Sequence, residues 1–194
     1  MALTQVNGQQ VAAVVTHLEM TERPKPRAVL SSPLRLRRWI EPDIAKYRTL
    51  FRRVGEPCLW FSRLVIDDEA LSSIIGDGKV EIYAVCDPKG IEVGLLELDF
   101  RQPGLCTIGF LGLVPELAGQ GFGKWFLAQA LMLGWRKGVN KLTVQTCTLD
   151  HPAALPSYRK AGFIPVRRTI ETFDDPRIFG LLPRDAAPHI PVLG

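Results

Sequence analysis

The sequence predicts a mixed α/β fold of the α+β type, in which a mostly antiparallel sheet of six to seven strands is flanked by about four helices. Two observations predict it. Three strand-like runs in the middle of the chain are separated only by turn residues, which is typical of an antiparallel meander. The last third then alternates helix and strand, and such a unit after a meander implies a mixed sheet with one parallel pair.

The chain of 194 residues has the length of one ordinary domain with additions at its ends. A strand-like run at residues 11–20 is followed by a proline-marked stretch at 22–26, so residues 1–30 are expected to form an N-terminal arm or an extra strand. The main domain is expected at residues 31–180. Three prolines in residues 181–194 predict an extended C-terminal tail that is packed on the surface or left mobile.

The first elements of the main domain are a short strand and two helices. Residues 34–39 alternate as a strand with two different faces. A proline at a helix start and an acidic first turn open a helix over residues 42–53, and Gly55 ends it. The second helix follows the acidic pair at positions 67 and 68 and ends at Gly76.

The remaining elements are the meander and the alternating last third. The predicted strands lie at residues 80–86, 91–100, 106–114, 141–146 and 163–173. The predicted helices lie at residues 121–137, where Gly138 is a good C-terminal stop, and at about 152–161, where Gly162 ends the helix. Because a proline inside a helix removes a hydrogen bond, Pro156 predicts a kink or a late start of the last helix.

Composition excludes several classes of protein. The 24 basic and 20 acidic residues leave a net charge of +4, with an isoelectric point near 9.0. The basic residues are spread along the chain, so a nucleic-acid partner is not required, and an anionic small ligand suits the charge equally well. The four cysteines are scattered without a CxxC pair, and the three histidines are not at metal-ligand spacing, so no metal site is expected.

The cysteine pattern also indicates a cellular compartment. Cys86 and Cys106 lie in strand-like apolar runs, where buried free thiols are the simplest interpretation, and free thiols fit a reducing compartment. No stretch approaches the roughly 18 apolar residues of a membrane span, and no secretory signal precedes the domain. The expected location is therefore the cytoplasm, with no membrane partner.

A glycine-rich loop carries the chemical information. Residues 111–115 end a strand, and residues 118–124 contain three glycines where a helix begins. Helix N-termini have unpaired N–H groups and a partial positive charge that favour phosphates, and glycines let a pyrophosphate approach the backbone. The dinucleotide motif does not fit, because three antiparallel strands precede the loop. The P-loop does not fit either, because Trp125 follows Lys124. A glycine-rich connection without a ligand remains the alternative.

This loop resembles the GNAT superfamily of acetyltransferases. The family pattern is Arg or Gln, two residues, Gly, one residue, and Gly or Ala, between a strand and a helix. Gly121, Phe122 and Gly123 match the last three positions, whereas Ala118 departs from the first. The departure weakens a side-chain role at this position but leaves the main-chain cradle intact. Leu113 and the residues after it match the strand end whose backbone pairs with the pantetheine arm in that family.

A second element of the same family follows about 35 residues later. Residues 150–163 contain the Ala, Tyr and Gly-Phe pattern of the family's fourth helix, and the motif-bearing resemblance covers residues 105–165. Other stretches, including residues 94–100 and 146–152, resemble a bacterial subgroup without assigned substrates. The resemblance implies a GNAT fold and acetyl-CoA as cofactor. It places the cofactor against Leu113, Val114, Ala118, Gly119, Gln120, Gly121, Phe122, Gly123, Lys124, Asp150 and Tyr158.

Acetyl transfer needs a neutral amine, a donor to the carbonyl oxygen and a proton for the leaving thiolate. The resemblance assigns the acid role to Tyr158, beside the coenzyme A sulfur; the alternative is a core tyrosine. Glu97 is the candidate general base, because it and Asp99 share the strand face opposite the apolar residues. Both acids could instead face solvent or pair with Arg101. His151 is a rival base, and Cys147 is expected only to line the site.

The acceptor is expected to be a primary amine on a small molecule or a peptide. The aromatic residues Trp39, Tyr47, Trp60 and Phe61 are candidates for its pocket, with ordinary core packing as the alternative. The arginines at positions 35, 37 and 38 could attract an acidic acceptor or simply be solvated. Two other functions remain open: an acyl-CoA-binding module without turnover, and a nucleic-acid-associated protein. Relatives in the family suggest a homodimer paired through the last strands.

Overall fold

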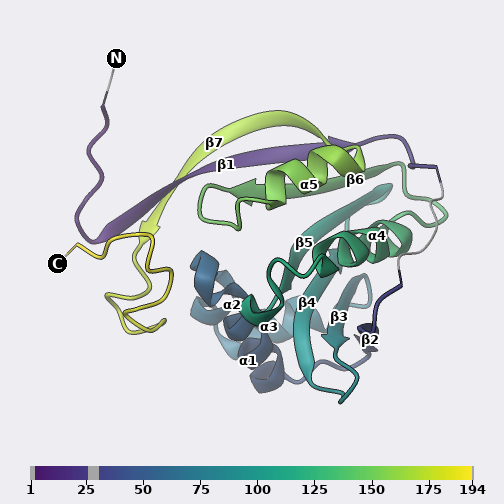
Figure 1. The fold of residues 1–194 in the computed structure, drawn as a ribbon, viewed down its shortest axis with the longest axis horizontal. Helices are drawn as coiled ribbons and strands as arrows, with labels where there is room; N and C mark the ends of the chain where they lie inside the picture. Colours follow the sequence, from purple (N-terminus) through teal and green to yellow (C-terminus); the bar gives the residue numbers. More distant parts are fainter. Residues whose placement is uncertain (1–2, 26–30, 194) are drawn as a thin grey trace.

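The computed structural model describes residues 3–25 and 31–193. Seven strands form one sheet in the order β2-β3-β4-β5-β6-β1-β7 (Figure 1). The strands are β1 (Gln10–Met20), β2 (Arg35–Trp39), β3 (Val80–Cys86), β4 (Glu92–Asp99), β5 (Leu105–Leu113), β6 (Lys141–Cys147) and β7 (Ile164–Asp174). Only β5 and β6 run parallel among these described strands, so the predicted mixed sheet with one parallel pair is confirmed.

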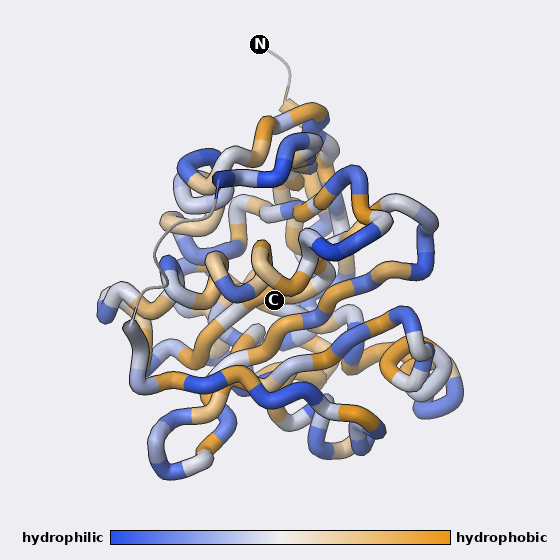
Figure 2. The backbone as a smooth tube through the Cα atoms, turned by 90° about the vertical axis from the view of Figure 1, so that its right-hand side faces the viewer, coloured by the Kyte–Doolittle hydropathy of each residue, from blue (hydrophilic) through white to orange (hydrophobic). Residues whose placement is uncertain are grey.

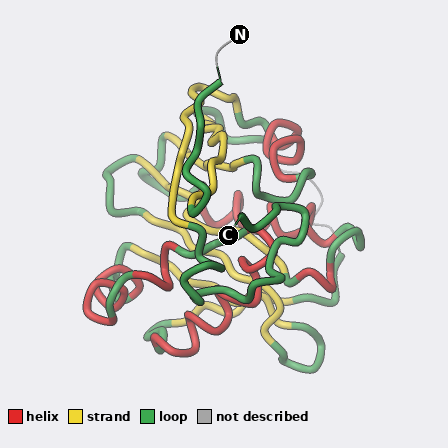
Figure 3. Tube along the Cα trace, turned by 90° about the vertical axis from the view of Figure 1, so that its left-hand side faces the viewer, coloured by secondary structure: helices red, strands yellow, loops and turns green. Residues whose placement is uncertain are grey.

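Helices cover both faces of this sheet (Figures 1 and 3). They are α1 (Ile44–Gly55), α2 (Ser62–Val65), α3 (Asp68–Ile75), α4 (Phe122–Gly134) and α5 (Ala154–Ala161), with short 3₁₀ turns η1 (Glu56–Cys58) and η2 (Pro115–Leu117). The helices α4 and α5 share one face, because Gly134 packs against Leu142 and Gly162 lies beside Met20. The helix α1 lies on the opposite face, which we call the α1 face.

Capping residues explain where the first helices begin. The side chain of Asp43 accepts a hydrogen bond from the backbone of Lys46 at 2.8 Å, so Asp43 is the N-cap of α1 and not part of its first turn. Asp67 caps α3 in the same way through Ala70, and Gly76 ends that helix as predicted. The helix α2 was not predicted, because four residues are too few to display a helical period.

A bulge in β5 determines which of its side chains lie on the α1 face of the sheet. The register of β4 against β5 shifts between Glu97 and Leu98, which leaves Gly109 as the extra residue. Before the bulge, Ile108 is buried with Leu98 on the α4 side. After the bulge, Phe110 lies opposite Glu97 and contacts α1. A Cβ at position 109 would lie 2.9 Å from a carboxylate oxygen of Glu97, so glycine makes room for that carboxylate.

The N-terminal strand is an inner member of the sheet. Residues 11–20 were expected to be an arm or an extra strand ahead of the main domain. Of these two alternatives the structure has the strand: β1 lies between β6 and β7, with Val15 opposite Cys147 on one side and Thr169 on the other. A boundary at residue 31 would therefore separate the sheet from one of its inner strands.

The helix α4 ends earlier than predicted. The expected end was residue 137, but the helix stops at Gly134 because the chain turns there to bury Trp135, whose Nε1 donates to the sulfur of Met20 at 3.3 Å. A late start of the last helix is confirmed: α5 begins at Ala154. Pro156 therefore lies in its first turn, where its missing N–H removes no helical hydrogen bond.

The C-terminal segment packs against the end of the β1–β7 ribbon. Leu182, Ala186 and Ala187 are buried beside Val11 and Leu59. The buried guanidinium of Arg177 holds the segment by donating to the carbonyl oxygens of residues 186, 187 and 190. Figure 2 shows hydrophobic segments through the middle of the molecule and hydrophilic residues at many outer turns. None of the helices in the described residues combines the length and apolar character needed to cross a membrane.

Candidate active site

The parallel strands β5 and β6 pair over only part of their length. Their register runs from Leu105 opposite Lys141 to Ile108 opposite Val144 and then stops. Beyond this point β5 continues to Leu113 paired with β4 alone, and β6 continues to Cys147 paired with β1 alone. We call the separated ends, residues 109–113 and 145–147, the β5–β6 fork. Each strand of the fork has one backbone edge without a strand partner.

The glycine-rich loop follows the β5 arm of the fork. Gly119 and Gly121 have φ angles of 75° and 81°, in the left-handed region that favours glycine. Gly121 is the N-cap of α4 and has no side chain to satisfy the first amides of the helix. Within the described residues, the amides of Gly119, Gly121 and Gly123 donate no hydrogen bond. An added Cβ at any of these three positions would meet nothing within 4 Å.

The loop therefore fits a diphosphate. Exposed, unpaired N–H groups at a helix N-terminus bind anions, and this loop offers several of them without side chains in the way. The side chain of Gln120 turns back to donate to the carbonyl oxygen of Glu116 at 2.8 Å, which leaves the cradle to the backbone. Ala118 and Lys124 are exposed on either side of the glycines.

Tyr158 of α5 approaches the fork from the α4 side. Its ring packs edge-on against Phe163 at 5.8 Å, and the residue is buried. Burial raises the pKa of the Tyr158 hydroxyl, and the charge of Asp150 raises it further. Within the described residues, this hydroxyl has no hydrogen-bond partner.

Asp150 joins the two arms of the fork at their tips. Its carboxylate accepts from the hydroxyl of Thr146 at 2.7 Å and the amide of Cys147 at 3.0 Å, both on β6. The other oxygen accepts from the indole of Trp60 at 3.2 Å. Trp60 packs against Phe110 of β5 with ring centroids 5.1 Å apart, so the Trp60–Asp150 hydrogen bond spans from one arm to the other.

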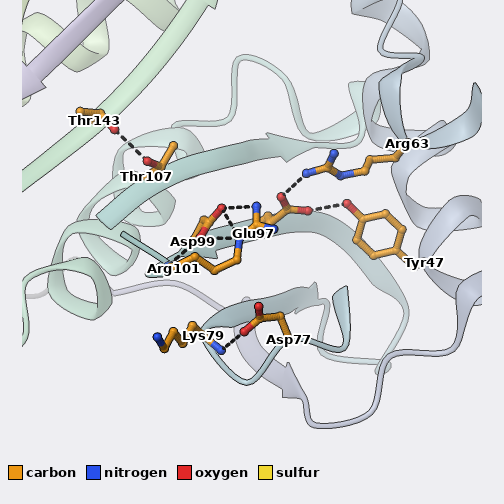
Figure 4. A network of polar contacts seen from close by, with 9 residues as sticks. All are labelled: Tyr47, Arg63, Asp77, Lys79, Glu97, Asp99, Arg101, Thr107 and Thr143. Atoms are coloured by element: carbon orange, nitrogen blue, oxygen red, sulfur yellow. Dashed lines mark hydrogen bonds and ion pairs between the residues drawn. The ribbon is translucent and has the colours of Figure 1, made fainter. Parts of the chain in front are cut away.

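Glu97 lies on the α1 face next to the fork, in a network that Figure 4 shows. Its carboxylate is only 2 % exposed. One oxygen accepts from the hydroxyl of Tyr47 at 2.7 Å and the other from Arg63 at 2.7 Å. Burial and the nearby carboxylate raise the pKa of Tyr47, which keeps this hydroxyl a donor. Asp99 instead pairs with Arg101 at 2.6 Å, as one of the sequence-based alternatives proposed.

Arg63 was not predicted. It lies 34 residues from Glu97 in the sequence, on a helix of four residues, and no local pattern marks it. Although burial lowers the pKa of a guanidinium, the carboxylate of Glu97 outweighs this effect and raises the pKa of Arg63. The guanidinium also lies 5.2 Å from the centre of the Phe110 ring.

The rival residues lie at the tips of the fork. The Nδ1 of His151 accepts from the amide of Ala153 at 3.1 Å, so the neutral ring carries its proton on Nε2 and has no free lone pair. Burial raises the pKa of both Cys147 and Cys58, and each thiol lies near the charge of Asp150. All four cysteines are free. Among the described residues, no three side chains form a group that could bind a metal ion.

The structure separates the aromatic residues that were considered for an acceptor pocket. Trp60 lies at the fork, whereas Phe61 packs on Phe173 of β7 with ring centroids 4.7 Å apart. Tyr47 is fully buried beneath Glu97. Trp39 lies on β2, the far edge of the sheet. The arginines of β2 are at that same edge, beside a hollow of about 450 Å³ that does not reach the fork.

Comparisons with known proteins identify the family and the fold. The family described as acetyltransferase (GNAT) matches residues 41–163, more than half of the chain. No curated protein matches the sequence. A GCN5-related N-acetyltransferase from Sphaerobacter thermophilus is similar in structure, with a TM-score of 0.62 and 18 % identity over 84 % of this chain and 51 % of that one.

Two further structures share the fold. An aminoglycoside acetyltransferase from an uncultured soil metagenomic sample has a TM-score of 0.54 and 21 % identity, over 67 % of this chain and 88 % of that one. A tandem GNAT protein from the clavulanic acid biosynthesis pathway has a TM-score of 0.55 and 17 % identity, over 84 % of this chain and 53 % of that one. The chain thus spans about half the length of the Sphaerobacter thermophilus and tandem structures.

Proposed function

Because the chain belongs to the acetyltransferase (GNAT) family, we propose that it transfers the acetyl group of acetyl-coenzyme A to a primary amine by direct attack. The observation that carries the proposal is the fork with a glycine cradle at its end. Amides from Gly119 to Gly123 would hold the diphosphate, and the free backbone edge of β5 up to Leu113 and Val114 would pair with the pantetheine arm. When bound, the cofactor supplies an activated thioester.

Tyr158 is the proposed acid. Its hydroxyl is protonated at neutral pH, although burial and Asp150 raise its pKa and so make it a weaker acid, and within the described residues it has no hydrogen-bond partner that competes for the proton. It can therefore give a proton to the leaving thiolate from the α4 side of the fork. Asp150 and Trp60 hold the two arms of the fork at a fixed separation, which supports a binding role for Asp150 through the shape of the site.

The general-base role of Glu97 remains a prediction. Its carboxylate is buried and accepts two hydrogen bonds, so a water molecule would have to carry the amine proton to it. His151 is a weaker candidate, since its Nδ1 lone pair is already occupied. Because both carboxylate oxygens of Glu97 already accept hydrogen bonds, the structure also favours one alternative function, a module that binds acyl-CoA without turnover.

Two measurements test the proposal. Calorimetric titration with acetyl-CoA should show binding, and mass spectrometry should detect acetylated product from a panel of primary amines. A Tyr158→Phe variant should lower kcat about 10-fold to 100-fold and leave the affinity for coenzyme A unchanged. Binding without any acetylated product would favour the non-catalytic module. Absence of coenzyme A binding would refute both the acetyltransferase and the acyl-CoA-binding module. Binding of nucleic acid that weakens steeply with salt would favour a nucleic-acid-associated protein.

We also propose a cytoplasmic homodimer of the bacterial subgroup that the sequence resembles. The four free cysteines fit a reducing compartment. The strand β7 is an exposed sheet edge of 11 residues, and it presents Ile164, Val166 and Ile170 to solvent, which supports pairing with a second copy. Light scattering should give twice the mass of the chain, and Ile170→Lys should lower it to the mass of the monomer.

A further inference from the structure

The α1 face of the sheet carries a row of polar side chains that no described helix covers. Thr107 lies opposite Thr143, and their hydroxyls are 3.0 Å apart. Gln145, two residues further along β6, lies opposite His17, which in turn lies opposite Arg167. Residues opposite one another in register share a sheet face, so these side chains form one continuous polar surface. We call it the open sheet face.

This surface is hollow. A cavity of about 480 Å³ is lined by residues that include His17, Glu19, Gln102, Thr107, Thr143 and Arg167. Its volume suits a small polar molecule. It begins two residues before Gly109, the first β5 residue of the fork, and therefore lies next to the place where a thioester would sit. The open sheet face is thus positioned to hold an acceptor.

Arg63 lies where the open sheet face meets the fork. Its Nη2 is 2.7 Å from Oε1 of Glu97. The same oxygen lies 2.9 Å from the position that a Cβ on Gly109 would occupy, so the guanidinium is beside the first β5 residue of the fork. The side chain is 18 % exposed. A guanidinium has five N–H donors, and the only hydrogen bond from this one, within the described residues, goes to Glu97; its Nε is buried without a partner, so the donors open to a ligand are those on Nη1 and Nη2.

The pair beneath Arg63 fixes its direction. Glu97 and Tyr47 are both buried. Tyr47 donates a hydrogen bond to the Glu97 carboxylate and fixes its orientation, and this carboxylate in turn accepts from Arg63. Phe110 supports the flat face of the guanidinium. Two of the other cations near the fork and the cavity are already paired: Arg101 with Asp99, and Lys141 with Glu19. A preorganised guanidinium with unused donors is suited to bind an oxyanion through two parallel hydrogen bonds.

We propose that Arg63 selects acceptors in which an anionic group, a carboxylate or a phosphate, lies within a few bonds of the attacking amine. The inference rests on the proposed function, because it places the acceptor amine at the fork. An oxyanion held by Arg63 next to Gly109 leaves the neighbouring amine at the mouth of the fork, with the rest of the molecule in the cavity over Thr107 and Thr143. Glu97 and Tyr47 then act as positioning residues for Arg63.

The test compares matched amines. Free amino acids are assayed against the same amino acids as carboxamides, and 2-aminoethyl phosphate is assayed against ethanolamine. For the wild-type protein, we expect kcat/KM to be at least about tenfold higher for one of the two anionic series, and the preferred series distinguishes carboxylate from phosphate. Calorimetric titration of the same amines, with coenzyme A present, measures acceptor binding without turnover.

Two variants locate the effect. Arg63→Lys keeps a charge beside Glu97 but removes the planar fork, so it should raise KM for the anionic amines at least about tenfold and leave KM for the neutral amines unchanged. A double variant, Arg63→Met with Glu97→Gln, removes the buried charges together and should abolish the preference in a folded protein. Arg52→Gln, an exposed arginine of α1, is the control and should change neither value.

The outcomes separate this proposal from the one on which it rests. Equal kcat/KM for charged and neutral amines would overturn the role of Arg63 and leave the acetyltransferase in place. A loss of kcat that is equal for all amines in Arg63→Lys would also overturn it, because Arg63 would then stabilise the reacting carbonyl. If no amine is acetylated, the proposed function fails, and tighter binding of anionic amines by calorimetry would still support the site.

Discussion

The buried pair of Tyr47 and Glu97 should be worth far more than an exposed ion pair of the same length. The hydroxyl of Tyr47 is 2.7 Å from the carboxylate, and the two side chains are 0 % and 2 % exposed. Hydrogen bonds to charged groups contribute about 1.5–3 kcal/mol, and burial leaves no water to replace a missing donor. We therefore expect Tyr47→Phe to lower the free energy of unfolding by about 2 kcal/mol.

A double-mutant cycle isolates this interaction from other effects of the substitutions. Urea unfolding of Tyr47→Phe, Glu97→Leu and the double variant should give a coupling free energy of about 1.5 kcal/mol or more. At a loss of about 2–4 °C per kcal/mol, Tyr47→Phe alone should lower Tm by about 4–8 °C. The control is Asp99 with Arg101, which are 22 % and 43 % exposed at 2.6 Å and should couple by less than about 1 kcal/mol. Equal coupling in the two cycles would refute the argument from burial.

Three further predictions concern the loop, the tail and the thiols. Gly121→Ala should weaken coenzyme A binding about tenfold by calorimetry, because the left-handed backbone strains a Cβ that also faces the diphosphate. Gly180→Ala, with a φ of 70° in the C-terminal segment outside the glycine loop, should leave binding unchanged. Arg177→Ala should cost about 3–5 kcal/mol in urea unfolding by stranding Asp175. Hydrogen bonds from Arg177 lower the pKa of Asp175 below its usual 3.8, so the part of this stability that comes from the Asp175–Arg177 pair is fully present above that value and is lost as pH falls through the lower one; a difference between variant and wild type that does not shrink as pH falls below 3.8 would contradict the argument. Burial raises the pKa of Cys58 and Cys106 to about 12, so thiol reagents at pH 8 should label both slowly in the folded chain and rapidly in urea.

The order and type of the main elements could be predicted because their signals are local. Periodicity located seven strands and four of the five helices, and turn glycines such as Gly76 and Gly162 marked helix ends. The glycine loop was recognisable for the same reason, since a backbone cradle needs glycines close together in the sequence. The end of α4 was missed because the burial of Trp135 depends on Met20, 115 residues away.

The candidate site could be predicted only in part, because much of it depends on distant contacts. The alternation of β4 placed Glu97 on a polar strand face, but its partners Tyr47 and Arg63 come from two different helices. The bulge at Gly109, which turns Phe110 toward α1, has no sequence signal stronger than a single glycine in a strand. The position of β1 inside the sheet depends on which strand edges remain free after the rest has assembled.

The inner position of β1 has a consequence for biosynthesis. The strand β1 is synthesised before its partners β6 and β7, and its most distant partner, Asp174, follows Gln10 by 164 residues. Until those last strands are made, an 11-residue strand with alternating apolar side chains has no native neighbour, and such unpaired strands are prone to aggregate. A circular permutant that starts at β2 and joins β1 after β7 would reduce the sequence separation between β1 and its two partner strands. Its refolding rate should therefore exceed that of the protein with the natural strand order.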